Sequence, residues 1–185
     1  MNTYIALLRG INVGGHKKIK MADLKQSFED LGFSDVLTYI QSGNVIFKDI
    51  LDDPSVIQTK IKAGIKKQFG FDISVLVITR QILSEVLQNN PFADTLKKSE
   101  MDGKKMYFML LFDQPDPAVV KEFTSISFDP EVFVITKNVI YLYAYNGYGK
   151  TKLNSNFFEK KLGCDATARN LSTMSKLLEL SFLTL

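Results

Sequence analysis

The feature that most constrains the fold of this chain is a pattern of strand-like and helix-like segments that runs through it twice. A short apolar run such as residues 4–8 is typical of a strand, whereas apolar residues three or four positions apart, such as Leu24, Phe28 and Leu31, are typical of a helix. In both halves the patterns follow the order βαββαβ, and a further amphipathic helix comes after each. A chain of 185 residues is long enough for two small domains of this kind.

The two halves supply matching sets of predicted elements. Those of the first half are strands at residues 4–8, 36–40, 44–47 and 73–78 and helices at residues 24–31, 56–69 and 82–87. Those of the second half are strands at residues 106–112, 131–135, 139–145 and 166–168 and helices at residues 118–123, 152–162 and 171–178. Residues 89–105 between them show no apolar period, so we expect one domain at residues 1–95 and another at residues 104–185.

Two short sequence echoes support a duplication. Asn-Val-Ile occurs at residues 44–46 and again at 138–140, and Thr79-Arg80-Gln81 is echoed by Ala168-Arg169-Asn170. We therefore predict an α+β fold, a tandem duplication of ferredoxin-like βαββαβ units that are each followed by an extra helix. Both faces of the predicted sheets are apolar, so we expect the face opposite the helices to be covered by the other repeat, by the extra helices or by a second chain.

The composition excludes several classes of protein. With one cysteine, Cys164, and one histidine, His16, the chain can form neither a disulfide framework nor a Cys/His zinc cluster, and we expect no metal and no cofactor. The first apolar run ends at Arg9 and is too short for a signal peptide or a membrane span, so we expect a cytoplasmic protein without a membrane partner. A net charge of +3 permits an anionic ligand but does not demand one, and either a monomer or a homodimer is compatible with the sequence.

Polar and glycine residues gather at the predicted end of the first strand. Glycines allow positive backbone angles and a close approach of a ligand to main-chain N–H groups, while arginine and asparagine offer donors. In a βαββαβ sheet, the turn between the second and third strands lies beside this loop. We therefore predict a site for a small anion here, although a purely structural turn is an open alternative; its residues are Arg9, Asn12, Gly14, Gly15, Ser42, Gly43 and Asn44.

A second polar edge is predicted in the second half, where the exits of the third and fourth strands meet. Gly149-Lys150-Thr151 resembles the end of a P-loop, but Ala144 stands where that motif needs its first glycine, so no NTPase is indicated. Helix N-termini at this edge favour anions, with solvated surface charge as the alternative. The candidate ligand-binding residues are Lys150, Thr167, Arg169, Asn170 and Thr173.

Three further features are better explained by structure than by function. Tyr141, Tyr143 and Tyr145 share one strand face and could stack bases, but the strand lacks the basic-glycine-aromatic pattern of RNA-recognition domains. His16 is expected to be a solvated surface residue without a catalytic partner. Cys164 is expected to be a small core residue rather than a nucleophile.

Four motifs spread over the chain resemble the DUF1697 family, a group of small, mostly bacterial proteins of uncharacterised function. The motifs are Arg9-Gly10-Ile11-Asn12-Val13-Gly14-Gly15, Thr38-Tyr39-Ile40-Gln41-Ser42-Gly43-Asn44-Val45, Asn90-Pro91-Phe92 and Ala166-Thr167-Ala168-Arg169-Asn170-Leu171-Ser172-Thr173. The resemblance implies a tandem ferredoxin-like architecture, and its signature stretches coincide with the two polar edges. Members of the family often have tryptophan after the Arg-Asn pair, where this chain has Leu171.

We therefore expect a protein that binds a small anionic, phosphate- or nucleotide-like ligand at these edges. A hydrolase or transferase with Ser42 or a lysine in a chemical role is an alternative, although no histidine or carboxylate lies within either signature stretch. Binding of single-stranded nucleic acid is a further alternative, supported by fold analogy and mild basicity alone.

Overall fold

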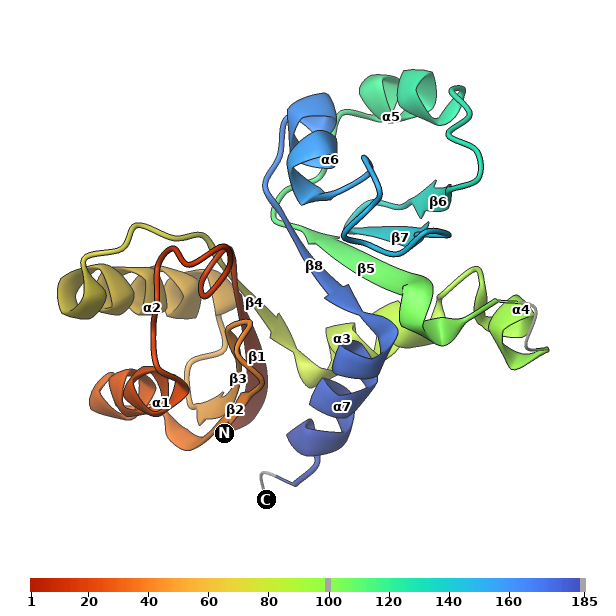
Figure 1. Ribbon diagram of the computed structural model, residues 1–185. Coiled ribbons are helices and arrows are strands. Elements are labelled where there is room, and N and C mark those ends of the chain that lie inside the picture. The colour runs from red at the N-terminus through yellow and green to blue at the C-terminus, as the bar shows by residue number, and fades with distance from the viewer. Residues whose placement is uncertain (99–100, 184–185) are drawn as a thin grey trace. The chain divides into compact units, whose positions relative to one another are not determined.

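The chain folds into two similar α+β halves, each built on a four-stranded antiparallel sheet (Figure 1). The computed structural model describes residues 1–98 and 101–183. Two compact units divide the chain: unit 1 contains Met1–Ser84 and Lys176–Leu185, and unit 2 contains Glu85–Ser175. The sequence repeats were expected to separate at residues 95–104, whereas the compact units divide within the helix that follows each repeat.

Unit 1 has the strand order β2-β3-β1-β4, with β1 at the centre paired antiparallel to β3 and β4. Figure 1 shows that α1 and α2 lie on one face of this sheet. Its elements are β1 (Asn2–Leu8), α1 (Met21–Asp30), β2 (Ser34–Tyr39), β3 (Asn44–Asp49), α2 (Pro54–Phe69), β4 (Val75–Thr79) and the start of α3 (Arg80–Gln88).

Local sequence explains where α2 begins and ends. The Asp53 side chain accepts a hydrogen bond from the Ser55 N–H at 2.8 Å, and Pro54 follows as the first helical residue, where its missing N–H costs nothing. Gly70 ends the helix in the left-handed conformation, with φ of 73°. The face between these ends buries every fourth residue against the sheet, namely Ile57, Ile61 and Ile65.

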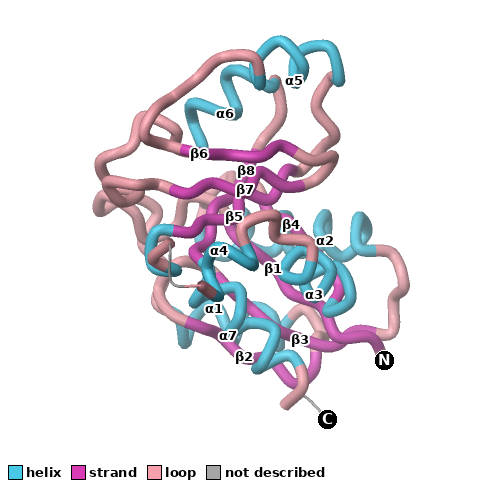
Figure 2. Tube along the Cα trace, turned by 90° about the vertical axis from the view of Figure 1, so that its right-hand side faces the viewer, coloured by secondary structure: helices cyan, strands magenta, loops and turns pink. Residues whose placement is uncertain are grey.

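Unit 2 repeats the arrangement with the strand order β6-β7-β5-β8. The helices α5 and α6 cover one face of its sheet, and the strands of both sheets are the magenta segments in Figure 2. Its elements are α4 (Ala93–Lys97), η1 (Gly103–Lys105), β5 (Met106–Leu111), α5 (Pro117–Thr124), β6 (Val132–Ile135), β7 (Val139–Tyr143), α6 (Ser155–Leu162), β8 (Ala166–Asn170) and the start of α7 (Leu171–Ser181).

The sheet faces that α1, α2, α5 and α6 do not cover are also buried, as the apolar character of both faces predicted. In unit 1 Ile5 and Leu7 are fully buried on this face, and in unit 2 Phe108 is fully buried and Tyr141 is 2% exposed. The Tyr141 hydroxyl donates a hydrogen bond to the Val86 carbonyl at 3.0 Å. Within unit 2, the end of α3 therefore helps to cover this face.

Strand register shows that the two sequence echoes do not occupy equivalent positions, since the first is offset by one residue and the second by two. Leu8 donates to the Gly43 carbonyl at 2.8 Å and Leu111 donates to the Asn138 carbonyl at 2.9 Å, so Asn138 is the counterpart of Gly43 and not of Asn44. At the fourth strands, Tyr4 pairs with Thr79 and Tyr107 pairs with Asn170. Thr79 is therefore the counterpart of Asn170, two residues beyond Ala168. The one-residue offset of Asn-Val-Ile reverses the face of each of its side chains, and the two-residue offset places Arg80 and Arg169 on different sides of the helix cap, so neither pair of triplets plays equivalent parts.

Several predicted boundaries also need correction. The stretch at residues 89–105 was predicted as a boundary without an apolar period, and it contains α4 and η1, which are too short to show such a period. The second helix of unit 2 was expected from residue 152, but α6 begins at Ser155 because the Asn154 side chain caps it, accepting from the Phe157 N–H at 3.1 Å. Among the described residues, no helix combines the length and the apolar character that crossing a membrane would need.

Candidate functional site

The end of β1 and the turn between β2 and β3 lie together in unit 1, as the topology predicted. Leu7 pairs with Asn44 across the sheet, and the next residue, Leu8, donates to the Gly43 carbonyl. Beyond the strand, the Asn12 side chain donates to the Gln41 carbonyl at 2.9 Å. Residues that are 29 or more positions apart in sequence are therefore joined by direct hydrogen bonds at one end of the sheet.

Asn12 holds the glycine-rich loop in its shape. Its Nδ2 also donates to the Ile19 carbonyl at 2.9 Å, its Oδ1 accepts from the Ile19 N–H at 2.8 Å, and its own N–H donates to the Lys17 carbonyl. Asn12 adopts a positive φ of 55°, which asparagine tolerates better than most residues. These bonds use the side-chain amide within the loop, so Asn12 braces the loop rather than facing outward from it.

Two different physical constraints explain why glycine occupies positions 14, 15 and 43. Gly14 and Gly15 have φ values of 59° and 79°, and both are exposed at the tip of the loop. Gly43 has φ of 72° and is buried, and a Cβ at this position would lie 2.8 Å from the Leu8 Cβ. Gly43 is therefore required by packing as well as by backbone angle.

Ser42 and Asn44 form the turn that follows β2. Asn44 is fully buried, and its Nδ2 donates to the Tyr39 carbonyl and to the Ser42 hydroxyl, both at 3.0 Å. Arg9 is half-buried, and its backbone N–H donates to the Ser74 carbonyl at 2.9 Å. The predicted residues are thus brought to one end of the sheet, and a ligand-binding role for them stays a prediction.

A cavity of about 410 Å³ opens where the glycine-rich loop reaches α1. Sequence reasoning placed Asn12 here but missed the lysines of the same loop, although the pair Lys17-Lys18 after two glycines was a visible signal. Lys20 occupies the N-cap position of α1, where its side chain cannot accept a hydrogen bond from the first-turn N–H groups. The cavity is lined by Asn12, Lys18, Ile19, Lys20, Asp23, Gln41 and Phe69.

In unit 2, the exits of β7 and β8 also meet at one end of the sheet, since Tyr143 pairs with Met106 and Asn170 with Tyr107. Arg169 is only 8% exposed, and its Nη1 donates to the Thr167 hydroxyl at 2.9 Å and to the Ala168 carbonyl at 2.8 Å. Burial lowers the pKa of this guanidinium to about 10, and the nearby Tyr148 partly opposes that shift.

The other predicted residues of this edge have separate environments. Asn170 caps α7, because its Oδ1 accepts from the Thr173 N–H at 2.8 Å, and Thr173 itself is buried. Lys150 is exposed and lines a cavity of about 340 Å³ together with Lys152, Asp129 and Glu131. Tyr148, in the same segment as Lys150, lies near enough to Arg169 to influence its pKa. The Tyr148 ring stacks on Tyr107 with the ring centroids 4.6 Å apart, and its hydroxyl shares a hydrogen bond with the Ser155 hydroxyl.

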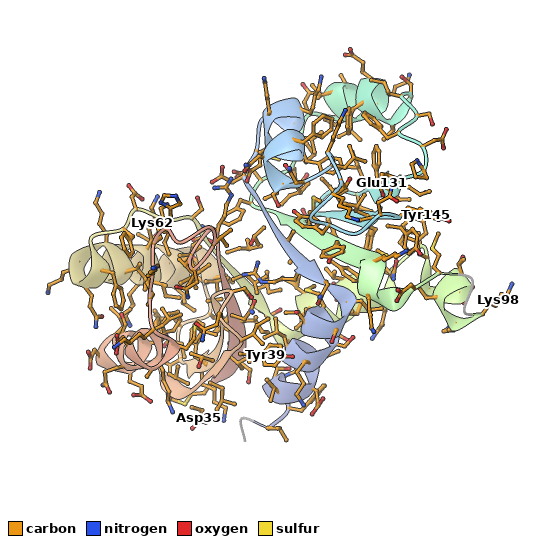
Figure 3. The ribbon with its side chains drawn as sticks, viewed as in Figure 1. Asp35, Tyr39, Lys62, Lys98, Glu131 and Tyr145 are labelled. Atoms are coloured by element: carbon orange, nitrogen blue, oxygen red, sulfur yellow. The ribbon has the colours of Figure 1, made fainter. Side chains whose placement is uncertain are left out.

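The tyrosines of β7 are packing residues, as expected. Tyr141 and Tyr143 are 2% and 6% exposed, and the Tyr143 hydroxyl accepts from the Asp102 N–H at 3.1 Å. Tyr145, beyond the strand, is exposed, and its N–H donates to the Glu131 carboxylate beside it (Figure 3). None of these three rings is arranged with the others as an open stacking platform.

Two residues with potential chemistry have settings that disfavour it. Burial raises the pKa of the Cys164 thiol, and the carboxylates of Asp113, Glu159 and Asp165 raise it further, which keeps the thiol protonated at neutral pH. His16 is exposed and its backbone N–H donates to the Val13 carbonyl. The described residues contain no group of three or more histidine, cysteine or acidic side chains placed to hold a metal ion.

Comparison with known proteins supports the sequence resemblance. A model of the family described as protein of unknown function (DUF1697) matches residues 1–141. The solved structure of a conserved bacterial protein from Streptococcus pneumoniae is similar to this chain, with 26% sequence identity and a TM-score of 0.75, over 97% of this chain and 98% of that one. No curated protein matches the sequence.

Proposed function

This chain belongs to the DUF1697 family, whose function is unknown, and from the geometry of unit 1 we propose that it binds a small phosphate-like anion at the junction of the glycine-rich loop and α1. The same proposal includes the interpretation of the two halves as duplicated ferredoxin-like units, which their shared strand order supports. In such a unit, the loop after the first strand is a natural place for a ligand because it leads directly to a helix N-terminus.

The cavity beside Lys18 and Lys20 is the observation that carries this proposal. Both lysines are among its lining residues, and the first-turn N–H groups of α1 contribute the positive end of the helix dipole. A capping side chain would compete for those N–H groups, but lysine has no acceptor. The cavity therefore combines mobile charges with fixed backbone donors, a combination that suits a phosphate or sulfate group.

Asp23 sets a limit on the affinity. Its carboxylate lies in the first turn of α1 and lines the same cavity, so it stabilises the helix and repels a bound anion. The expected ligand is thus a weakly held anion. Removal of the negative charge in Asp23→Asn should strengthen its binding.

The unit 2 residues are left out of the proposed site. Arg169 is buried against Thr167 and Ala168, and Asn170 is used as the cap of α7. At Lys150, two carboxylates line the cavity along with the two lysines, which leaves little net attraction for an anion.

Thermal denaturation in the presence of inorganic phosphate tests the proposal. At about ten times the dissociation constant, phosphate should stabilise the protein by about 1.4 kcal/mol and raise Tm by about 3–6 °C. Lys18→Gln should reduce this shift and Asp23→Asn should increase it, because the two variants change the charge of the cavity in opposite directions.

Lys98→Gln is the matched control, since Lys98 is an exposed lysine of unit 2 that lies beyond α4 (Figure 3). It removes the same charge as Lys18→Gln and should leave the phosphate shift unchanged. Equal shifts in all three variants, or no shift at all in the unaltered protein at about 20 mM phosphate, would contradict the proposed site.

A further inference from the structure

A larger cavity, of about 600 Å³, lies at the other end of the unit 1 sheet, where β1 begins and β4 ends. Its volume falls within the range of about 300–1,000 Å³ that is typical of small-molecule sites. The residues that line it come from four separate segments, and those used below are Asn2, Thr3, Asp52, Arg80 and Phe182. Its positive charge is a guanidinium, whereas that of the cavity at Lys18 comes from lysines.

Arg80 is held in a fixed position at this cavity. Because Tyr4 pairs with Thr79, the preceding residue Thr3 lies next to Arg80, and the Arg80 Nη2 donates to the Thr3 hydroxyl at 2.8 Å. The guanidinium also lies over the Phe182 ring, with Cζ 4.8 Å from the ring centroid. The bond to Thr3 uses one of the five N–H groups of the guanidinium, so others can serve an anionic group of a ligand.

Phe182 adds an aromatic surface. Its side chain is 56% exposed although it lines a cavity and has Arg80 against one side. An exposed phenylalanine ring supported by a cation offers a flat apolar surface on which a nucleobase can stack.

Asp52 supplies the acceptors, and Asn2 orients it. The Asn2 Nδ2 donates to the Asp52 Oδ1 at 2.8 Å, and this bond orients the carboxylate beside the first residue of β1. A carboxylate with two oxygens accepts more than one hydrogen bond, and paired hydroxyls are a natural partner for it. Asn2 and Thr3 point to opposite faces of the strand, so Asp52 and Arg80 lie on either side of the end of β1 and suit a ligand with two separate polar ends.

From these groups we infer that the cavity binds a nucleoside monophosphate. The phosphate lies at Arg80, the base stacks on Phe182, and the ribose hydroxyls donate to Asp52. This site is separate from the one at Lys18, and neither proposal depends on the other.

Isothermal titration of the unaltered protein with AMP, GMP, CMP and UMP tests the inference. At least one of the four should bind saturably, with a dissociation constant of about 1 mM or below. Adenosine and the other nucleosides, which lack the phosphate, should bind on the order of tenfold more weakly, and so should ribose 5-phosphate, which lacks the base.

Three variants assign the binding to this cavity. Arg80→Gln should weaken nucleotide binding on the order of tenfold while leaving nucleoside binding unchanged, and Phe182→Ala should weaken both. Asp52→Asn should weaken the ribonucleotide but not its 2′,3′-dideoxy analogue. Because Phe182 is largely exposed, its truncation spares the core and keeps the test valid if Arg80→Gln affects folding.

Lys18→Gln is the control that separates the two sites, because it removes one positive charge from unit 1 at the other cavity and should leave nucleotide affinity unchanged. The inference is overturned if none of the four nucleotides binds at about 5 mM, or if binding persists unchanged in Arg80→Gln and Phe182→Ala.

Discussion

Each half of this protein carries one arginine where its fourth strand meets the following helix, but the two arginines stand on opposite sides of the helix cap. Arg80 follows the cap residue Thr79, whereas Arg169 precedes the cap residue Asn170. Arg80 is half-buried and lines a cavity, and Arg169 is 8% exposed on a sheet face. An offset of two residues therefore decides whether the arginine of a similar triplet lines a cavity or is buried on the sheet.

Register also identifies the true counterparts. Ile78 pairs with Ile5 in unit 1, and Arg169 pairs with Phe108 in unit 2, so Arg169 occupies the position that an isoleucine fills in the first half. Leu171 is the counterpart of Arg80. Unit 2 thus lacks the cation of the unit 1 cavity, and we expect nucleotide binding to be confined to unit 1.

The largest effect on stability is expected when the buried arginine of unit 2 is introduced at the equivalent position of unit 1. Ile78 is 5% exposed, and Ile78→Arg would bury a guanidinium without the Thr167 hydroxyl that Arg169 has. We expect a loss of more than about 3 kcal/mol in the free energy of unfolding, measured by urea denaturation. Ile82→Arg is the control, because Ile82 is 39% exposed and the same substitution there should cost less than about 1 kcal/mol. Similar losses in the two variants would show that burial at residue 78 does not make the guanidinium costly there.

The second comparison concerns the turn before the third strand. Gly43 and Asn138 both accept from the last residue of the central strand, but Asn138 does not share the positive φ of Gly43. Gly43→Ala would place a Cβ 2.8 Å from that of Leu8, and we expect it to cost about 2–4 kcal/mol. Asn138→Ala should cost less than about 1 kcal/mol. Equal losses by urea denaturation would mean that the two turns are constrained alike.

The order of the elements could be predicted from sequence because it depends on local periods. The buried faces of α1 and α2 repeat every three or four residues, and caps such as Asp53 and Gly70 mark the ends. Register could not be predicted, because it depends on hydrogen bonds between distant strands. The repeated Asn-Val-Ile triplet was therefore aligned one residue away from its structural position.

The candidate sites were predictable only in part, for the same reason. The loop at Asn12 and the turn at Gly43 follow directly from the topology of the sheet. The cavity at Arg80 joins Asn2, Asp52 and Phe182 from segments without a shared motif, so no local pattern indicates it. The sequence did not indicate Lys18 and Lys20 as site residues, because charged side chains near a glycine-rich loop usually belong to the solvated surface.

A smaller effect, of about 1 kcal/mol for each variant, is expected at the two caps that the shifted arginines flank. Asn170→Ala removes an acceptor 2.8 Å from the Thr173 N–H, and Thr79→Ala removes one 3.2 Å from the Ile82 N–H. The shorter bond should make Asn170→Ala the more costly of the two by urea denaturation. Asn170→Asp, which keeps an acceptor, should restore most of the stability; a variant as unstable as the alanine would show that the amide group has another part to play.

The smallest effect should appear in the loops that lead into the fourth strands, where the electrostatics of the halves are opposite. Asp72 lies between Lys62 and Lys66, whose contacts lower the pKa of its carboxyl, whereas the pKa of Cys164 is raised by burial and by three carboxylates. The folded chain thus resists ionisation of this thiol, and stability should fall as pH rises above the ordinary thiol pKa of 9.0. For the same reason, iodoacetamide at pH 8 should alkylate Cys164 more slowly than it alkylates free cysteine.

Removing one of the carboxylates should speed this alkylation measurably. Asp113 is exposed, and Asp113→Asn should raise the thiolate fraction, and with it the rate, by about two- to threefold at low ionic strength. The acceleration should disappear at about 1 M salt, where screening removes the field of Asp113. Asp94→Asn, which removes a carboxylate that does not act on Cys164, should leave the rate unchanged. An equal rate increase in both variants would assign the change to net charge rather than to the local field that distinguishes this loop from the one at Asp72.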